Sequence, residues 1–450
     1  MNTFNPERWV VKIMSVCTAI LFSTAPFGWA DVGPASVEQL AKSNEELRKI
    51  VSSLTDKVES LENRLEKAER APQTVSIPAG GEAGEGEGVL RTKGGDIELS
   101  GFIDTSFNWN FVTPNVAPGG TNATGNTTLR AFDRESDTFD LNSIQLNFKR
   151  PAPEAGGAGF NTEFTYGTDA GVIESAGFLG GTDELSIQEA YVELKAPIGS
   201  GLTVWVGKFA TLFGAEVIEN YMNWNASRSL LFNLAIPFTH TGARAMYNWL
   251  DGKVGTAIGI VNGWDSAIDN NKVKDIEAQV KWTPNENFNI AQNFISGSQI
   301  VDDQGDNRIV FDTVATWRPL PNDLPKLTFM ANYDYGLEER LGKGREGGPA
   351  DWQGYALYTK YDLYDWLTLA ARWEQFWDDQ GVRTGTLGLN NLWEMSYTAD
   401  IKVYKNLLTR LEYRHDHSDK GNRTNPTGAF DGATENNQDT AGVSMIYLFG

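Results

Sequence analysis

Charged residues of both signs interrupt the stretch VGKFATLFGAEVIENYMNWNASRS, which occupies positions 206–229. The stretch begins with the alternation of a strand, but the alternation stops before Glu216 and Glu219, and Arg228 follows them. Fixed charges on a segment that leaves a strand can create a local electric field that orders and selects small hydrated solutes. Selection of solutes by these charges requires a wall around the segment. The function of the charges therefore depends on the elements that surround them.

The first thirty residues have the features of a secretory signal peptide. Arg8 and Lys12 form a basic beginning, and an apolar stretch follows over 13–29. Gly28 and Ala30 place small residues at the two positions that a signal peptidase reads. The alternative is an N-terminal membrane anchor, but the apolar stretch is short and contains a proline. We therefore expect residues 1–30 to be removed on export.

Composition excludes several kinds of site. Cys17, the only cysteine, lies in the predicted signal, so the exported chain would lack disulfides, cysteine nucleophiles and cysteine metal ligands. Loss of two basic residues, Arg8 and Lys12, and one acidic residue, Glu7, changes the formal net charge from −21 to −22. So acidic an exported chain is unsuited to nucleic acid. We expect neither a nucleic-acid partner nor a cofactor.

A seven-residue repeat of apolar side chains covers residues 37–68 and predicts a short coiled-coil helix within the segment 31–70. A lone amphipathic helix would leave the apolar seam exposed. Asn44 lies in this seam, where it is costly unless it pairs with its copies, so we expect a homo-oligomer. The segment would lie in the periplasm, where it could hold protomers together or reach peptidoglycan. The predicted oligomerisation residues are Asn44, Leu40, Leu47, Leu54 and Leu61.

Residues 71–96 are rich in Gly and Glu and are predicted to form a flexible linker, after which residues 97–450 show strand-like alternation. In LLTRLEYRHD (407–416), for example, Leu411 and Tyr413 share one face while Arg410 and Arg414 share the other. We identify sixteen such runs: 97–112, 137–150, 158–167, 184–195, 201–211, 239–249, 253–263, 272–283, 287–298, 307–318, 326–336, 351–362, 366–378, 391–403, 406–417 and 437–449.

Short turns and long polar loops alternate between these runs, as in an outer-membrane barrel. Mean hydropathy is −0.36, and no second apolar run approaches the ~20 residues of a spanning helix. The pattern therefore predicts an all-β, antiparallel transmembrane β-barrel of about 16 strands. Tryptophans near both kinds of connection predict two aromatic belts: Trp249, Trp282, Trp317 and Trp366 near short turns, and Trp109, Trp264, Trp373 and Trp377 near long loops.

The polar faces of the predicted strands carry charges of both signs, which cannot face lipid cheaply and so should line water. Sixteen strands enclose a lumen too wide for wall side chains to fill, so we predict an aqueous channel. A lumen filled by paired charges, or plugged by a loop, is the alternative. The longest loop, 212–238, is the third long one, and we expect it to fold inward with its acidic residues facing a basic wall. The predicted pore residues are Lys208, Glu216, Glu219, Arg228, Arg244, Arg372, Arg410 and Arg414.

Three stretches carry a family resemblance: VGKFATLFGAEVIEN (206–220), SRS (227–229) and PFTHTGARAMYNW (237–249). They resemble the β-barrel porin-2 (OmpL-like) family of bacterial outer-membrane proteins, and the similarity extends over most of 97–450. The resemblance implies a barrel in the outer membrane with a porin role, but no particular solute. Two departures are the aromatic residue one place before the C-terminus and the added coiled coil. The positions that match the motifs are Lys208, Glu216, Asn220, Arg228, His240 and Arg244.

These observations favour a non-enzymatic porin that passes small hydrophilic solutes or ions across the bacterial outer membrane, with lipid around it. A trimer is favoured because porins commonly form trimers, although the heptad pattern leans towards a dimer. Two other classes remain open. The first is a scaffold that sheaths a partner or tethers the envelope to the cell wall. The second is an outer-membrane hydrolase, which would pair His240 with Ser227 or Ser229. His415 and His417 have too few neighbouring ligands to predict a metal site.

Overall fold

The computed structural model describes residues 88–92, 95–111, 127–176, 184–302, 305–339, 348–385, 389–419, 430 and 435–450. The predicted signal peptide, the coiled coil with its oligomerisation residues and most of the linker lie outside the described residues. The described residues all belong to one compact unit, 83–450.

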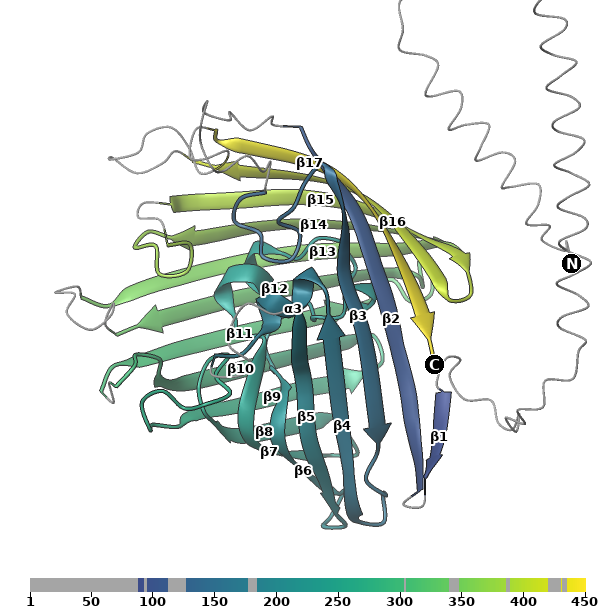
Figure 1. The fold of residues 1–450 in the computed structure, drawn as a ribbon, viewed down its shortest axis with the longest axis vertical. Helices are drawn as coiled ribbons and strands as arrows, with labels where there is room; N and C mark the ends of the chain where they lie inside the picture. Colours follow the sequence, from purple (N-terminus) through teal and green to yellow (C-terminus); the bar gives the residue numbers. More distant parts are fainter. Residues whose placement is uncertain are drawn as a thin grey trace, which may run out of the picture. The chain divides into compact units, whose positions relative to one another are not determined.

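Sixteen antiparallel strands close into a barrel (Figure 1). Each strand from β2 to β17 pairs with its neighbour in sequence, and β17 pairs with β2 to close the ring. The predicted fold class is confirmed. The strands are β2 (Gly95–Asn110), β3 (Thr138–Arg150), β4 (Gly157–Tyr166), β5 (Leu185–Ala196), β6 (Leu202–Ala210), β7 (Thr239–Trp249), β8 (Val254–Val261), β9 (Asp275–Asn285), β10 (Phe288–Ser298), β11 (Asn307–Trp317), β12 (Leu327–Glu338), β13 (Ala350–Tyr364), β14 (Leu367–Asp378), β15 (Leu389–Tyr404), β16 (Leu407–Ser418) and β17 (Asn437–Phe449).

One additional short strand precedes the ring. β1 (Gly88–Thr92) pairs antiparallel with the beginning of β2, with Gly88 opposite Leu99. This strand lies in the range that we assigned to the flexible linker, so the prediction of a linker as far as residue 96 is wrong for its last part. The local sequence GVLRT contains residues with strand propensity, which the Gly- and Glu-rich composition of the whole range concealed.

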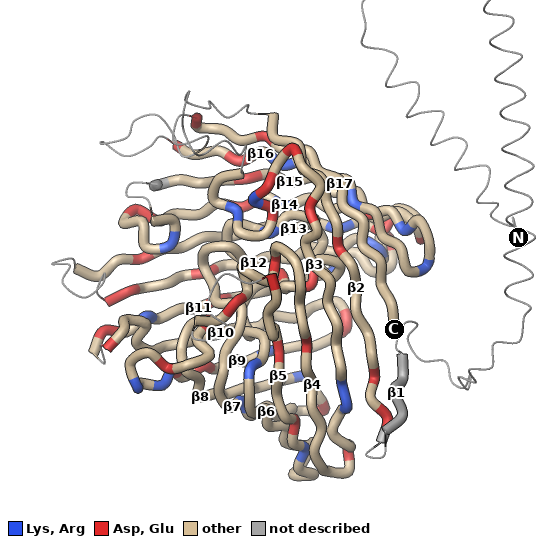
Figure 2. The backbone as a smooth tube through the Cα atoms, viewed as in Figure 1, with Lys and Arg blue, Asp and Glu red and all other residues tan. Residues whose placement is uncertain are grey.

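The wall has two chemically different faces, as the alternation predicted. In β16, Leu411 and Tyr413 are 48% and 43% exposed, whereas Arg410 and Arg414 are buried. Because successive side chains of a strand point to opposite faces, the exposed apolar residues form the lipid-facing surface and the charged residues point into the barrel. Figure 2 shows charged residues along the strands as well as in the connections.

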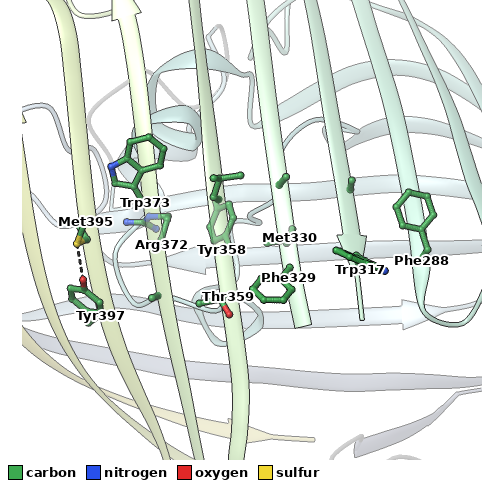
Figure 3. A pocket seen from close by; sticks show the side chains of 14 residues that line it. Phe288, Trp317, Phe329, Met330, Tyr358, Thr359, Arg372, Trp373, Met395 and Tyr397 are labelled. Atoms are coloured by element: carbon green, nitrogen blue, oxygen red, sulfur yellow. Dashed lines mark hydrogen bonds between the residues drawn. The ribbon is translucent and has the colours of Figure 1, made fainter. Parts of the chain in front are cut away.

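The lipid-facing surface includes an apolar groove over β10 to β15, with a volume of about 510 Å³ (Figure 3). Small side chains at Ala315, Ala331 and Ala371 alternate there with bulky ones such as Trp317 and Trp373. A surface of this composition fits hydrocarbon chains, in agreement with an outer surface that contacts lipid.

Most of the tryptophans predicted to form the aromatic belts lie on the outer surface near the strand ends, as expected. Trp109, Trp249, Trp282 and Trp317 are each about half exposed. Trp264 is an exception, and its assignment to a belt is wrong. Its ring lies inside the barrel, 6.4 Å from the buried Trp352, with the guanidinium groups of Arg308 and Arg383 over it.

The long connections contain the helical elements, which Figure 1 shows enclosed by the strands. They are α3 (Thr168–Ile173), the 3-10 turn η1 (Asn220–Met222) and the π-helical turn η2 (Leu231–Ala235). In the described part of the chain, no helix combines the length and hydropathy needed to span a bilayer.

Candidate functional site

Loop 212–238 leaves the wall after β6 and crosses the lumen. Its side chain Asn220 donates to Asp104 of β2 at 2.8 Å, and its backbone N–H at Gly214 donates to Asp312 of β11 at 3.2 Å. The strands β2 and β11 lie on nearly opposite sides of the ring. The loop is therefore bound to two facing walls and folds into the barrel.

The reason for this inward path is the apolar run LLFNLAIPF at 230–238. Leu231, Phe232 and Ile236 are almost completely buried in a cluster that also contains the inward-facing wall residues Trp352 and Phe376. Burial of each large apolar side chain is worth about 1.5–3 kcal/mol. In an extracellular position the same run would be exposed to water, so the interior of the barrel is the favourable place for it.

The polar backbone of the loop is satisfied by charged side chains of the wall. Glu412 of β16 accepts the N–H groups of Ala226 and Ser227 at 2.7 and 2.9 Å. Glu374 of β14 accepts those of Leu230 and Leu231 at 2.6 and 3.1 Å. A buried backbone group without such a partner would lose the free energy of a hydrogen bond. The wall carboxylates thus fix the position of the loop.

Arg410 provides hydrogen-bond donors for the carbonyl groups of the loop. Its guanidinium donates to the carbonyl oxygens of Asn220 at 2.6 Å and Asn223 at 2.5 Å, and it pairs with Asp400 at 2.9 Å. Arg414 likewise donates to the carbonyl of Arg228 at 2.6 Å. These arginines, predicted as pore-lining charges, bind the loop instead of facing open water.

A buried ion network joins the loop to β14 and β15. Arg372 pairs with Glu216 of the loop at 2.7 Å and with Glu394 of β15 at 2.6 Å, and it donates to the carbonyl of Ser227 at 2.7 Å. The side chains of Arg372, Glu216 and Glu394 are all at most 2% exposed. Because a buried charge without a partner is strongly unfavourable, each member requires the others. Glu216 therefore faces a basic wall residue, as expected, but as part of a packed ion pair.

Three other predicted site residues also hold structure together. Arg228 is 2% exposed, and its guanidinium donates to the carbonyls of Ile218 and Ala226 in its own loop. Lys208 donates to the carbonyl of Ile187 at 2.7 Å. Arg244 forms a bidentate ion pair with Glu277 of β9, with N–O distances of 2.6 and 3.0 Å.

Glu219 lies in a different environment from the one predicted. It accepts hydrogen bonds from Gln145 and Gln188, and it lines a cavity of about 560 Å³ together with Glu163 and Glu189. The wall that it approaches is therefore acidic, and the expectation of a basic wall opposite Glu219 is wrong. The charges on each strand can be located from the sequence, but which strands face a given loop residue is decided by the closed barrel.

A second cavity of about 510 Å³ also borders η1, and Tyr221 and Met222 line both cavities. It reaches the strand ends that are joined by short turns and carries both signs of charge. Its charged lining residues are Lys326, Lys360, Lys402, Arg410, Asp362, Asp365 and Asp400.

The arrangement of His240 does not match that of a hydrolase. Its ring nitrogens contact Thr211 and the carbonyl of Gly263, both at 3.1 Å. Ser227 instead accepts from Arg372 and Arg414, and Ser229 accepts the N–H of Phe232. No cluster of three or more His, Cys, Asp or Glu side chains suited to a metal ion occurs among the described residues.

Two further inward segments were not predicted. Residues 127–137 of the first long loop pack against loop 212–238: Phe132 contacts Phe232 and Phe238, and Arg130 binds the wall. α3 places Asp169 beside Ser143, whose hydroxyl donates to it at 2.8 Å. The hydrophobic residues in these loops were the available signal. The polar composition of the long connections as a whole conceals this signal in the sequence.

Comparisons with known proteins agree with this architecture. A family model described as "Putative beta-barrel porin-2, OmpL-like" matches residues 96–449. No curated protein matches the chain. Among solved structures, the outer membrane channel DcaP of Acinetobacter baumannii is 13% identical with a TM-score of 0.51, covering 83% of this chain and 100% of that one.

Two more porins are similar to the chain. The anion-selective porin from Comamonas acidovorans is 12% identical, with a TM-score of 0.51 and coverage of 78% of this chain and 99% of that one. Salmonella typhi OmpF, solved in complex with daunomycin, is 13% identical, with a TM-score of 0.50 and coverage of 80% and 100%. At such identities these structures establish the fold alone.

The buried network predicts a large effect of removing its central cation. Arg372→Ala should lower the free energy of unfolding by about 3–5 kcal/mol, because Glu216 and Glu394 would remain buried without their partner. Equilibrium unfolding of the purified barrel in urea measures this. Arg318→Ala, at an exposed arginine near the end of β11, is the matched control and should change stability little. Equal stability of the two variants would contradict the role of Arg372.

Asp169 predicts a pH dependence. Burial raises its pKa from 3.8 to about 7, although the nearby charge of Arg228 acts in the opposite direction. In the unfolded chain the Asp169 carboxyl loses its proton near its ordinary pKa of 3.8, whereas in the folded protein it keeps the proton up to about pH 7. The free energy of unfolding therefore falls as the pH rises from about 4 to 7, because folding must take up a proton in that range. Asp169→Asn should therefore raise the unfolding temperature at pH 8 but not at pH 4. An equal change at both pH values would refute this assignment.

Proposed function

Since the chain belongs to the family of OmpL-like β-barrel porin-2 proteins, we propose that it is an outer-membrane porin whose channel is narrowed by loop 212–238. Small hydrophilic solutes and ions would diffuse through it passively, without catalysis. One observation carries the proposal: the loop is bound to nearly opposite walls, through Asp104 and Asp312. Any solute that crosses the barrel must therefore pass close beside the loop.

The predicted pore residues take two roles in this proposal. Arg372 holds the loop through Glu216, and Arg410 and Arg414 hold it through its carbonyl groups. Arg228 braces the loop from within by binding the carbonyl of Ile218. They determine how wide the passage is, because they determine where the loop lies. Lys208 and Arg244 support the neighbouring wall through Ile187 and Glu277.

Selectivity would come from the charges that line water. Glu163, Glu189 and Glu219 line one cavity without any basic side chain among its lining residues. The second cavity carries lysines and aspartates together. A water-filled space with an uncompensated acidic wall attracts cations and repels anions. We therefore propose a preference for small cations.

We also propose that the protein forms a homo-oligomer. The heptad positions around Asn44 supply the sequence argument for association. We favour a trimer because porins commonly form trimers, although the heptad pattern leans towards a dimer. In this arrangement the N-terminal segment would lie in the periplasm, within reach of peptidoglycan.

Ion conductance of the purified protein in a planar bilayer tests the proposed function. In a salt gradient the reversal potential should indicate cation preference, and Glu219→Gln should reduce that preference, with cation-to-anion permeability falling about twofold or more. Glu286→Gln, at an exposed acidic residue in a short turn, is the control and should leave the reversal potential unchanged. The absence of any channel in the wild-type protein would refute the porin proposal itself.

A further inference from the structure

A narrow polar crevice lies between loop 212–238 and the wall formed by β16, β17, β2 and β3. Its volume is about 40 Å³, which is enough for a few water molecules but not for a sugar-sized solute. Apart from Glu412, the wall residues that line the crevice are uncharged. They include Ser106, Asn108, Asn142, Gly442 and Ser444.

The hydroxyl of Ser444 indicates that this crevice is a place for water or an ion. Ser444 is 5% exposed, and its oxygen has no hydrogen-bond partner among the described residues. A buried hydroxyl without a partner is unfavourable unless water or an ion satisfies it. Gly442 adds to the space, since a Cβ atom there would lie 2.3 Å from the side-chain oxygen of Asn108.

Other parts of the boundary between loop and wall are closed by direct contacts. On one side, Gln188 donates to both Glu163 and Glu219. On another, Asp312 and Asn332 accept the N–H groups of Gly214 and Ala215 at 3.2 and 3.1 Å. These groups would have to separate before a solute could pass. At the crevice Glu412 also accepts the N–H groups of Ala226 and Ser227, but loop and wall leave a water-sized space beside these contacts.

Arg130 covers the crevice from the side of the long loops. Its guanidinium pairs with Asp416 at 2.5 Å and Asp133 at 2.8 Å, and it donates to Thr440 at 3.0 Å. The same segment is held by Phe132, whose ring lies 5.7 Å from that of Phe232. Arg130 thus bridges the first long loop and the wall directly above the water-sized space.

We propose that this crevice is the narrowest part of the permeation path and that Arg130 is its selectivity-determining residue. The inference rests on the proposed porin function and specifies where solutes pass and which ones do. The transported class is small monovalent cations, because the crevice has no room for larger solutes and its charged lining residues are two acidic side chains and one basic one. Arg130 opposes their entry by its charge, whereas Asp133 and Glu412 line the same crevice and favour it.

Cysteine modification locates the path, because the predicted mature chain contains no cysteine. Ser444→Cys would be treated in the bilayer with 2-aminoethyl methanethiosulfonate, a small charged thiol reagent. Conductance should fall at least about twofold, since the added group exceeds the space available. The control is Met445→Cys, whose side chain is the next along β17 and faces lipid. It should show no loss.

Charge removal tests Arg130. Arg130→Gln should raise conductance and shift the reversal potential towards stronger cation preference, while Arg130→Lys should retain most of the wild-type selectivity. Unchanged selectivity in Arg130→Gln, or unchanged conductance after treatment of Ser444→Cys, would overturn the proposed path even though the wild-type protein conducts. If the wild-type protein does not conduct at all, the porin function and this inference both fail.

Discussion

The structure depends on one constraint: a loop folded into a barrel must have its backbone polar groups and its charges satisfied by the wall. Glu412 and Glu374 accept its N–H groups, and Arg410 and Arg414 donate to its carbonyl groups. A lumen of sixteen strands cannot be filled by wall side chains alone. The loop therefore occupies the centre, and the charges on the polar faces of the strands hold it there.

Because the loop fills the centre of the lumen, the charges on the inward strand faces have a different role from the one expected in an open pore. In an open aqueous pore, Arg372 would face water and act on passing solutes. Here it lies between Glu216 and Glu394, at most 2% exposed. Arg372 lines neither of the two larger cavities nor the crevice, so in our proposal selectivity depends on charged groups that do line these spaces, such as Glu219 and Arg130. The residues that narrow the channel, such as Arg372, therefore differ from those that select the passing ions, such as Glu219.

The sequence predicted the barrel well because strand alternation is a local property. Inward charges such as Arg372 and Glu394 are flanked by outward apolar residues, and the sixteen runs agree closely with β2 to β17. The site was harder to predict, since it depends on which distant strands face a given loop residue. Glu219 meets Gln188, and Trp264 packs inside against Trp352, because of register and ring position. The apolar run after Arg228 was a usable local signal for the inward fold of the loop.

The central claim is that loop 212–238 restricts the channel from inside the barrel. Its most direct test is the single-channel conductance of a variant in which residues 217–228 are replaced by a short Gly-Ser linker, with barrel assembly confirmed by the shift in electrophoretic mobility on heating. Conductance should rise several-fold over that of the wild-type protein, because the lumen of a sixteen-stranded barrel is wide without its loop. Unchanged conductance in a correctly assembled barrel would contradict this claim.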